Sequence, residues 1–96
     1  MKKQTSITKS VYQKVYERDS GQCIVCGRND IQCHHFIPRS CGGKGIEENL
    51  VMLCTYHHKV IHESKNRNQL NKHLETYLKA IYSNWDKDML KYRKGR

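Results

Sequence analysis

Large apolar residues are scarce in this 96-residue sequence, which contains one Phe, one Trp and three Met. A chain of this length forms a single domain, and a domain this small buries a modest fraction of its surface. So poor a core gives little stability by itself, and small domains of this kind are usually held by disulfides or by a metal ion. The shortage of apolar residues therefore predicts a single domain with a disulfide or metal cross-link.

Long apolar segments are also missing. Residues 1–10 are polar and basic and lack the apolar segment of a signal peptide, and no stretch approaches the roughly 18 apolar residues that a membrane-spanning helix needs. We therefore expect a cytoplasmic protein without membrane contact. In such a reducing compartment the five Cys favour metal binding over disulfides, and their odd number leaves at least one thiol outside any pairing.

Acidic residues are few: 9 Asp and Glu stand against 18 Lys and Arg, which gives a formal charge of +9. A small domain with this charge suits a polyanionic partner such as nucleic acid. Net charge informs on association with other molecules and not on the fold. The alternative to a nucleic-acid-binding protein is therefore a basic protein without a specific partner.

The first third of the chain predicts a helix followed by a tight turn. Residues 1–9 read as a polar, basic arm. A helix is expected over residues 10–19, with Ser10 as its N-cap and Gly21 just past its end. Residues 22–27 then form a knuckle.

The middle of the chain predicts two strands and a helix. Residues 30–38 read as a strand that ends at Pro38, because proline cannot continue a ladder of hydrogen bonds. Residues 40–45, with three Gly, are expected to form a loop. The short apolar run 50–53 suits a second strand, and residues 55–62 suit a helix.

A long amphipathic helix is predicted from Asn68 to Trp85, because apolar residues recur there at i, i+4, i+7 and i+8 spacing. Its aromatic residues are expected to pack in the core rather than to stack on bases. From Asp86 on, the sequence predicts a solvated basic tail. The basic residues of this tail are Lys87, Lys91, Arg93, Lys94 and Arg96.

Two pairs of Cys and His at two-residue spacing predict a closed metal site. Cys23 and Cys26 form the first pair, and Cys54 and His57 form the second. Two ligands at this spacing fit a knuckle that offers both side chains to one ion, and four Cys and His ligands make a structural zinc site. Ordinary buried thiols are the alternative, but two such pairs in one short chain favour zinc.

The predicted helix over residues 55–62 carries ligands for two different sites. His58 and His62 lie four residues apart, so their imidazoles share one face of the helix. His57 lies about 100° away from His58 around the helix axis and therefore faces elsewhere. His73, in the long helix, is expected to be an ordinary surface or core residue.

His34 and His35 are adjacent in the first predicted strand and therefore point to opposite faces. One can bind a metal ion while the other does different chemistry. Together with Asn49, His58 and His62 they form a second polar cluster, which is too dense to be explained as unrelated surface residues.

Several blocks of the sequence occur in the order found in HNH endonucleases, and the chain resembles that family over about residues 10–63. The blocks are RDSGQCIVCG at 18–27, HHFIPRS at 34–40, GG at 42–43, ENLVMLC at 48–54 and HKVIH at 58–62. The spacing of Asn49, His58 and His62 also resembles the nuclease domain of colicin-type toxins. Small stand-alone members with the Cys pairs resemble proteins that bacteriophages and prophages encode near packaging genes, which implies phage packaging proteins as associated partners.

The resemblance implies a role for each member of the second cluster. His35 matches the general base that activates water. His34 and His62 match ligands of the catalytic divalent ion, and His58 matches a third ligand in colicin-like members. Asn49 matches the residue that fixes the segment carrying the base, and in some members it binds the metal directly.

The resemblance also implies two kinds of ion. The Cys and His quartet matches the structural zinc site, although the family commonly has Cys where this chain has His57. Many members have Asp in place of His34, and a neutral imidazole makes the site less anionic. Zn²⁺, Ni²⁺ or Mn²⁺ are therefore expected to serve as the catalytic ion as well as Mg²⁺. Cys33 and Cys41 match no family position, and Cys41 is a potential competitor for metal.

The implied fold is α+β: a ββα-metal (His-Me finger) core with a zinc knuckle, an N-terminal helix and a long C-terminal amphipathic helix. We expect one nuclease domain over residues 1–96, with its core in 10–63 and a helical extension in 66–96. The implied cell is a bacterial or phage-infected bacterial cell.

The implied activity is hydrolysis of DNA phosphodiester bonds to a 5′ phosphate and a 3′ hydroxyl. Arg39, Lys44 and Lys59 flank the predicted site and are expected to contact phosphates, and the basic arm and tail add sequence-independent affinity for double-stranded DNA. No separate module for base recognition is evident, so weak sequence preference and nicking are expected. The alternative is a non-catalytic zinc module that binds nucleic acid, which would have no use for His35.

Overall fold

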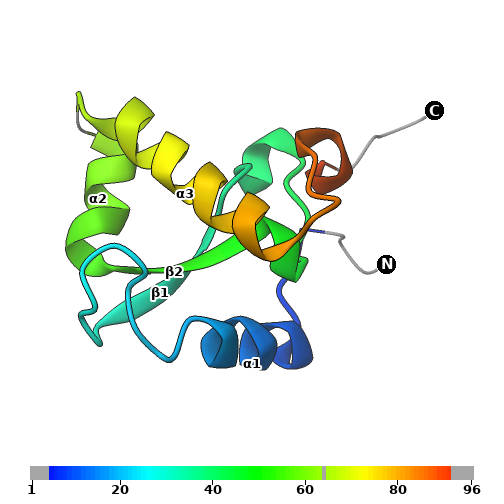
Figure 1. The fold of residues 1–96 in the computed structure, drawn as a ribbon, viewed down its shortest axis with the longest axis horizontal. Helices are drawn as coiled ribbons and strands as arrows, with labels where there is room; N and C mark the ends of the chain where they lie inside the picture. The colour runs from blue at the N-terminus through cyan, green and yellow to red at the C-terminus, as the bar shows by residue number, and fades with distance from the viewer. Residues whose placement is uncertain (1–4, 64, 92–96) are drawn as a thin grey trace.

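The computed structural model describes residues 5–63 and 65–91 and arranges them as helices around a two-stranded sheet (Figure 1). No helix in these two ranges is both long and apolar enough to cross a membrane. Short 3₁₀ helices in the same ranges cover Arg39–Cys41, Glu47–Asn49 and Lys87–Leu90. The main elements in chain order are α1 (Lys9–Arg18), β1 (Ile31–His35), β2 (Leu50–Cys54), α2 (Thr55–Glu63) and α3 (Arg67–Ile81).

The strands β1 and β2 pair antiparallel, with Ile31 opposite Cys54 and His35 opposite Leu50. Helix α1 lies on one side of the sheet, and α2 with α3 lies on the other (Figure 1). Every residue of β2 is buried, because both faces of this strand are covered. The mixture of helices and a small antiparallel sheet is consistent with the expected ββα fold.

Alternate side chains of β2 divide between two cores. Leu50 and Met52 pack with Val15 of α1, while Val51 and Leu53 belong to the larger core under α2 and α3. The continuous apolar run that predicted a strand is thus explained by burial on both faces.

The predicted N-cap of the first helix was wrong by two residues. The helix is capped by Thr8, whose Oγ1 accepts from the N–H of Val11 at 3.2 Å, and Ser10 lies inside the first turn. The end of the helix agrees with the prediction. Gly21 has a φ of 64°, and its N–H donates to the Tyr16 carbonyl at 2.9 Å.

Strand β1 ends at His35, three residues before the predicted end at Pro38. The N–H of Phe36 still donates to the Asn49 carbonyl at 2.7 Å. The next N–H, on Ile37, donates instead to the side chain of Asn49 at 2.8 Å, so the ladder stops. Part of the loop expected over residues 40–45 belongs to the 3₁₀ helix Arg39–Cys41.

The C-terminal region differs most from expectation. Helix α3 ends at Ile81, because Tyr82 is extended (φ −113°, ψ 105°), so Trp85 lies beyond the helix. The Trp85 indole N–H donates to the Glu48 carbonyl at 2.8 Å. The expected solvated tail is also wrong at Leu90, which is fully buried. The predicted tail residues Arg93, Lys94 and Arg96 lie outside the described residues.

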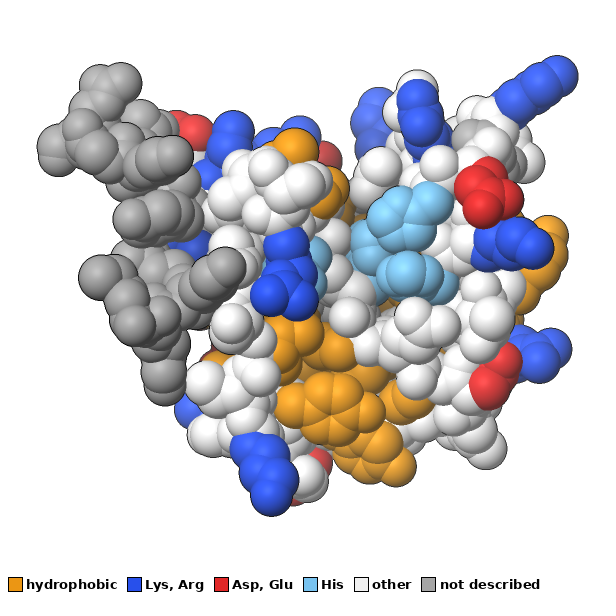
Figure 2. Space-filling view, turned by 180° about the vertical axis from the view of Figure 1, so that it is seen from behind, with side chains coloured by type: hydrophobic (Ala, Val, Ile, Leu, Met, Phe, Trp, Pro, Cys, Tyr) orange, Lys and Arg blue, Asp and Glu red, His pale blue; other side chains and the backbone are white. Residues whose placement is uncertain are grey.

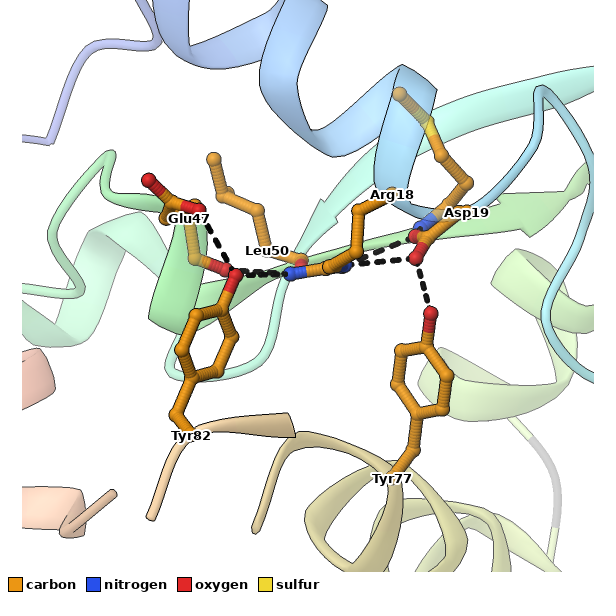
Figure 3. A network of polar contacts seen from close by, with 7 residues as sticks. Arg18, Asp19, Glu47, Leu50, Tyr77 and Tyr82 are labelled. Carbon is orange, nitrogen blue, oxygen red and sulfur yellow. Dashed lines mark hydrogen bonds and ion pairs between the residues drawn. The ribbon is translucent and has the colours of Figure 1, made fainter. Parts of the chain in front are cut away.

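Arg18 connects α1 to the second half of the chain (Figure 3). Its guanidinium is almost fully enclosed and donates to the backbone carbonyls of Glu47 (2.8 Å) and Leu50 (2.6 Å) and to the Tyr82 hydroxyl (3.1 Å). Burial alone would lower the pKa of Arg18, but the hydrogen bonds to Asp19 and Tyr82 raise it above its usual value. The buried charge is therefore fully paired.

Asp19 is the partner of Arg18 and anchors β2 as well. Its carboxylate accepts two hydrogen bonds from the guanidinium, at 2.7 and 3.0 Å, and one from the backbone N–H of Met52 at 2.9 Å. The Tyr77 hydroxyl of α3 also donates to it (Figure 3). One buried ion pair thus joins α1, β2 and α3.

Candidate metal centres and active site

The Cys and His residues predicted to form a closed site lie together. Cys54 Sγ is 3.4 Å from His57 Nδ1 and 3.6 Å from Cys26 Sγ, and Cys23 Sγ is 3.7 Å from His57 Nδ1. One ligand atom from each of the four residues falls within 4.8 Å of all the others. We call Cys23, Cys26, Cys54 and His57 the quartet.

The backbone around the quartet explains how these side chains converge. The knuckle is closed by the Gly27 N–H, which donates to the Cys23 carbonyl at 2.8 Å, and Gly27 has a φ of 81°. The Ile24 N–H ties the knuckle to β2 by donating to the Met52 carbonyl at 3.1 Å. At the start of α2, the His57 N–H donates to Cys54 Sγ at 3.4 Å.

The quartet fits a zinc ion and does not fit a disulfide. Four ligands placed tetrahedrally at about 2.3 Å from an ion are roughly 3.7 Å apart, close to the three separations measured here. A disulfide needs two sulfurs at about 2.0 Å, whereas the closest approach of Cys26 and Cys54 is 3.6 Å. Three thiols and one imidazole are also the donors that zinc prefers.

The remaining cysteines, Cys33 and Cys41, belong to neither metal-type group among the described residues. Burial raises the pKa of Cys33 to about 11, which keeps this thiol protonated and unreactive at neutral pH. Cys41 is exposed in the 3₁₀ helix Arg39–Cys41.

A second group joins one residue of β1 to two residues of α2. The rings of His34, His58 and His62 lie with centroids 4.7 to 5.8 Å apart, and their ligand nitrogens fall within 4.8 Å of one another. We call these three residues the trio. His34 is buried, His58 is half-buried and His62 is exposed, so the trio opens from the core to the surface.

His34 carries an unsatisfied atom that fits a metal ligand. Its Nε2 is the one buried side-chain nitrogen or oxygen without a hydrogen-bond partner in the described part of the chain. Burial, then the neighbouring His58 and His62, lowers the pKa of His34 to about 3, so the ring is neutral and has a free lone pair. A buried unpartnered nitrogen is costly, and a cation held with His58 and His62 would satisfy it.

His35 points to the opposite face of the sheet from His34, as the alternation of strand residues requires. Its Nε2 lies 2.9 Å from the Thr5 carbonyl oxygen. Burial is the largest cause that lowers the pKa of His35 below its usual value. The positive charge of Arg39 lowers this pKa as well, while the hydrogen bond to the Thr5 carbonyl raises it in part. The ring is therefore neutral at physiological pH and able to accept a proton.

Asn49 is fully buried and holds the segment that follows His35. Its Oδ1 accepts from the Ile37 N–H at 2.8 Å, and its Nδ2 donates to the carbonyls of Ile37 (3.2 Å) and Lys44 (2.8 Å). One amide thus fixes both ends of the loop between residues 37 and 44. This geometry suits the positioning role expected from the family resemblance.

The basic residues expected at the site differ in exposure. Arg39 and Lys59 are exposed, and Lys44 is half-buried. Figure 2 shows His side chains gathered in a pale-blue patch, with Lys and Arg side chains in blue near it and an acidic side chain in red at its edge. On a chain with a formal charge of +9, such a histidine surface is suited to a phosphate group.

Comparison with known proteins agrees with this arrangement. Residues 23–64 match the family model of HNH endonucleases. The match contains the quartet and the trio together with His35 and Asn49, and it confirms the resemblance over a little less than half of the chain.

The chain is also similar to the type IV methyl-directed restriction enzyme EcoKMcrA of Escherichia coli, with 33% identity over 66 residues. The alignment covers 58% of this chain and 24% of that enzyme, so the chain spans about a quarter of the relative's length. The two matches support nuclease activity as the functional class.

Two features of the site were not predicted from the sequence. The first is Thr5, which was assigned to a polar arm and instead contacts His35 across 30 residues of chain. The residue that could have indicated this contact is Gly45. It has no side chain, and this leaves room for the backbone of Ser6, next to Thr5. The second is the pair Arg18 and Asp19, which belongs to the sequence blocks shared with the family. Arg18 and Asp19 hold β2 through hydrogen bonds to the backbone of Leu50 and Met52.

Proposed function

We propose that this protein is a metal-dependent endonuclease that hydrolyses phosphodiester bonds of DNA. The observation that supports it most is the trio with its unpartnered His34 Nε2, in a segment that matches HNH endonucleases and also contains a neutral His35. A module that only binds nucleic acid has no need for a buried, unsatisfied imidazole beside two further imidazoles.

The trio would hold the catalytic divalent ion, which we propose to be Mg²⁺ or Mn²⁺, with Ni²⁺ or Zn²⁺ as substitutes. Such an ion supplies Lewis-acid chemistry at a phosphate oxygen and at the leaving 3′ oxygen. Three imidazoles carry no negative charge, so the trio does not repel an approaching phosphate. The quartet would hold one structural zinc ion, with His57 as its fourth ligand.

His35 would act as the general base and take a proton from the attacking water, which typically accelerates such a reaction ~10²–10⁴-fold. Asn49 would position this base through the loop that it holds. Arg39, Lys44 and Lys59 would contact phosphates of the substrate. The products would be a 5′ phosphate and a 3′ hydroxyl.

The wider setting is also part of the proposal. Double-stranded DNA is the proposed substrate, nicked with weak sequence preference, by one domain over residues 1–96. A bacterial or phage-infected bacterial cytoplasm and phage packaging proteins as partners follow from the family resemblance.

The test is a plasmid-nicking assay with Mg²⁺, Mn²⁺ or Ni²⁺, comparing the unmodified protein with His35→Ala. His73→Ala is the matched control, because His73 is an exposed histidine of α3 outside both metal-type groups. We expect nicking by the unmodified protein and by His73→Ala, and a loss of at least about 100-fold in His35→Ala. Full activity in His35→Ala would refute the assignment of the base, and DNA binding without nicking by any chain would favour the non-catalytic module.

A further inference from the structure

The hydrogen bond between the N-terminal arm and His35 fixes where the proton of this ring resides. The Thr5 carbonyl oxygen, 2.9 Å from Nε2, can only accept a hydrogen bond. Nε2 therefore carries the proton, and the neutral ring has its lone pair on Nδ1. His35 is buried, with 9% of its surface exposed, and its described hydrogen bond runs through Nε2, so Nδ1 is the nitrogen left to accept a proton.

The part of the arm that supplies this carbonyl, residues 5–8, is docked on the protein. Ile7 packs against the core cluster formed by Val15, Leu50 and Met52. The next residue, Thr8, caps α1 through its hydroxyl. Thr5 is thus two residues away from the half-buried Ile7, which brings its carbonyl to His35 in a defined position.

Gly45 provides the space through which the arm passes. A Cβ atom at this position would lie 2.0 Å from the Ser6 carbonyl oxygen and 3.1 Å from the Thr5 carbonyl oxygen. Gly45 itself is buried, and its neighbour Lys44 is held through its carbonyl by Asn49. The arm, the loop and the His35 ring therefore form one packed unit.

We propose that the N-terminal arm is part of the active site, with the Thr5 carbonyl holding His35 in the Nε2–H form so that Nδ1 is the proton acceptor. This rests on the proposed function, in which His35 is the base. In the reaction, Nδ1 takes a proton from water as the water oxygen bonds to phosphorus. The bond from phosphorus to the 3′ oxygen breaks, and that oxygen takes a proton from solvent. The Thr5 carbonyl then accepts a hydrogen bond from the imidazolium and stabilises its charge.

Two truncations separate the carbonyl from the rest of the arm. Removing residues 1–4 leaves Thr5 in place, whereas removing residues 1–6 deletes the Thr5 carbonyl. Both truncations remove the charges of Lys2 and Lys3, and both keep Ile7 and Thr8. The comparison between them therefore isolates Thr5 and Ser6 from the effect of charge on DNA affinity.

The readouts are the tautomer of His35 and the nicking rate at saturating DNA. Long-range ¹H–¹⁵N NMR of His-labelled protein, with the signal assigned through His35→Gln, distinguishes Nε2–H from Nδ1–H. We expect a single Nε2–H form in the full chain and after removal of 1–4. Removal of 1–6 should yield mixed forms and reduce the nicking rate about tenfold or more relative to removal of 1–4, at equal DNA affinity.

Gly45→Ala tests the same contact in the full-length chain, because the added Cβ displaces the Ser6 carbonyl. It should reduce the nicking rate as the longer truncation does. When the two changes are combined, the nicking rate should fall no further than it does with either change alone. His73→Ala, at an exposed position of α3 outside both metal-type groups, should nick at the unmodified rate. If the longer truncation loses its zinc or no longer melts cooperatively, the test rests on Gly45→Ala. The tautomer of His35 and the nicking rate in that variant then show whether the Thr5 contact matters.

An unchanged or faster rate after removal of 1–6 would overturn the proposal, and a faster rate would mean that the arm blocks the base. An Nδ1–H ring in the full chain would overturn it as well. Absence of nicking by the full chain refutes the proposed function and with it the role of the arm, while the tautomer shift on truncation still reports whether Thr5 holds the ring. The two failures are therefore distinguishable.

Discussion

The quartet and the trio are both built on helix α2, yet they differ in the way a structural and a catalytic site should differ. The quartet has four donors, including three thiols, and the hydrogen bond from the Ile24 N–H to the Met52 carbonyl ties its knuckle to β2. The trio has three imidazoles, of which His34 is buried, His58 is half-buried and His62 is exposed. A closed set of four donors saturates a zinc ion, whereas three donors at a surface leave positions for water and substrate. His57 and His58, adjacent in sequence, divide between these two sites.

The largest expected effect comes from breaking the quartet. Cys54→Ser removes a fully buried thiol that also accepts from the His57 N–H at the start of α2. Because a structural zinc site contributes ~10–16 kcal/mol of binding free energy to folding in small zinc domains, we expect loss of bound zinc and of the cooperative thermal transition. Metal analysis and circular dichroism measure both. Cys33→Ser, outside the quartet, should keep its zinc, and a zinc-free Cys54→Ser that still melts cooperatively would contradict a structural role.

Breaking the trio should separate activity from folding. His34→Ala removes the buried ligand and the unpartnered Nε2 together, so we expect nicking to fall at least about 100-fold. The zinc content should stay at one ion per chain, because the quartet is untouched. Nicking assays and metal analysis on the same sample provide the measurement. Loss of zinc along with activity would show that the two sites are not independent.

Asn49→Ala should affect stability and activity together, since Asn49 links the loop after His35 to the rest of the protein. The change removes three hydrogen bonds to backbone groups of the half-buried Ile37 and Lys44. We expect the free energy of unfolding to fall by about 2–4 kcal/mol and nicking to weaken while zinc is retained. Urea denaturation measures the first quantity, and an unchanged midpoint would refute the role of Asn49 in holding the loop.

The smallest expected effect lies outside both sites, in the network of Arg18, Asp19 and Tyr77. Tyr77→Phe removes the hydroxyl that donates to Asp19, and we expect a loss of about 1–2 kcal/mol in the free energy of unfolding. Burial, followed by the hydrogen bond to Asp19, raises the pKa of Tyr77 to about 12 in the folded protein.

The unfolded chain, with an ordinary tyrosine pKa of about 10, therefore loses this proton first as the pH rises. The stability that Tyr77 contributes is complete below pH 10 and is lost as the pH rises towards 12. Thermal melts across this range should show a steeper decline for the unmodified protein than for Tyr77→Phe. Equal slopes would contradict the assigned hydrogen bond.

The features predicted best from the sequence are those set by local spacing. Ligands two residues apart fit one knuckle, and histidines four residues apart share one face of a helix, so the quartet and the pair His58 and His62 were found without a structure. The strand β2 was equally clear, because a run of apolar residues buried on both faces leaves a continuous signal.

The features that were missed depend on contacts between distant residues. Apolar periodicity extends from α3 to Trp85, but this indole packs on Phe36 and bonds to Glu48 after the helix has ended. Leu90 reads as part of a basic tail and is nevertheless buried. By residue type Ser10 is the better helix cap, but Ile7 packs against the core, and the helix begins after Thr8.

The division of labour between the two sites is tested most directly by measuring bound zinc and nicking on one sample before and after brief treatment with EDTA, followed by addition of Mg²⁺ or Mn²⁺. We predict that about one zinc ion per chain survives the treatment while nicking disappears, and that the added ion restores nicking without changing the zinc content. Nicking that persists after EDTA with no added ion, or that declines only in step with the loss of zinc, would contradict the assignment of a separate catalytic ion to the trio.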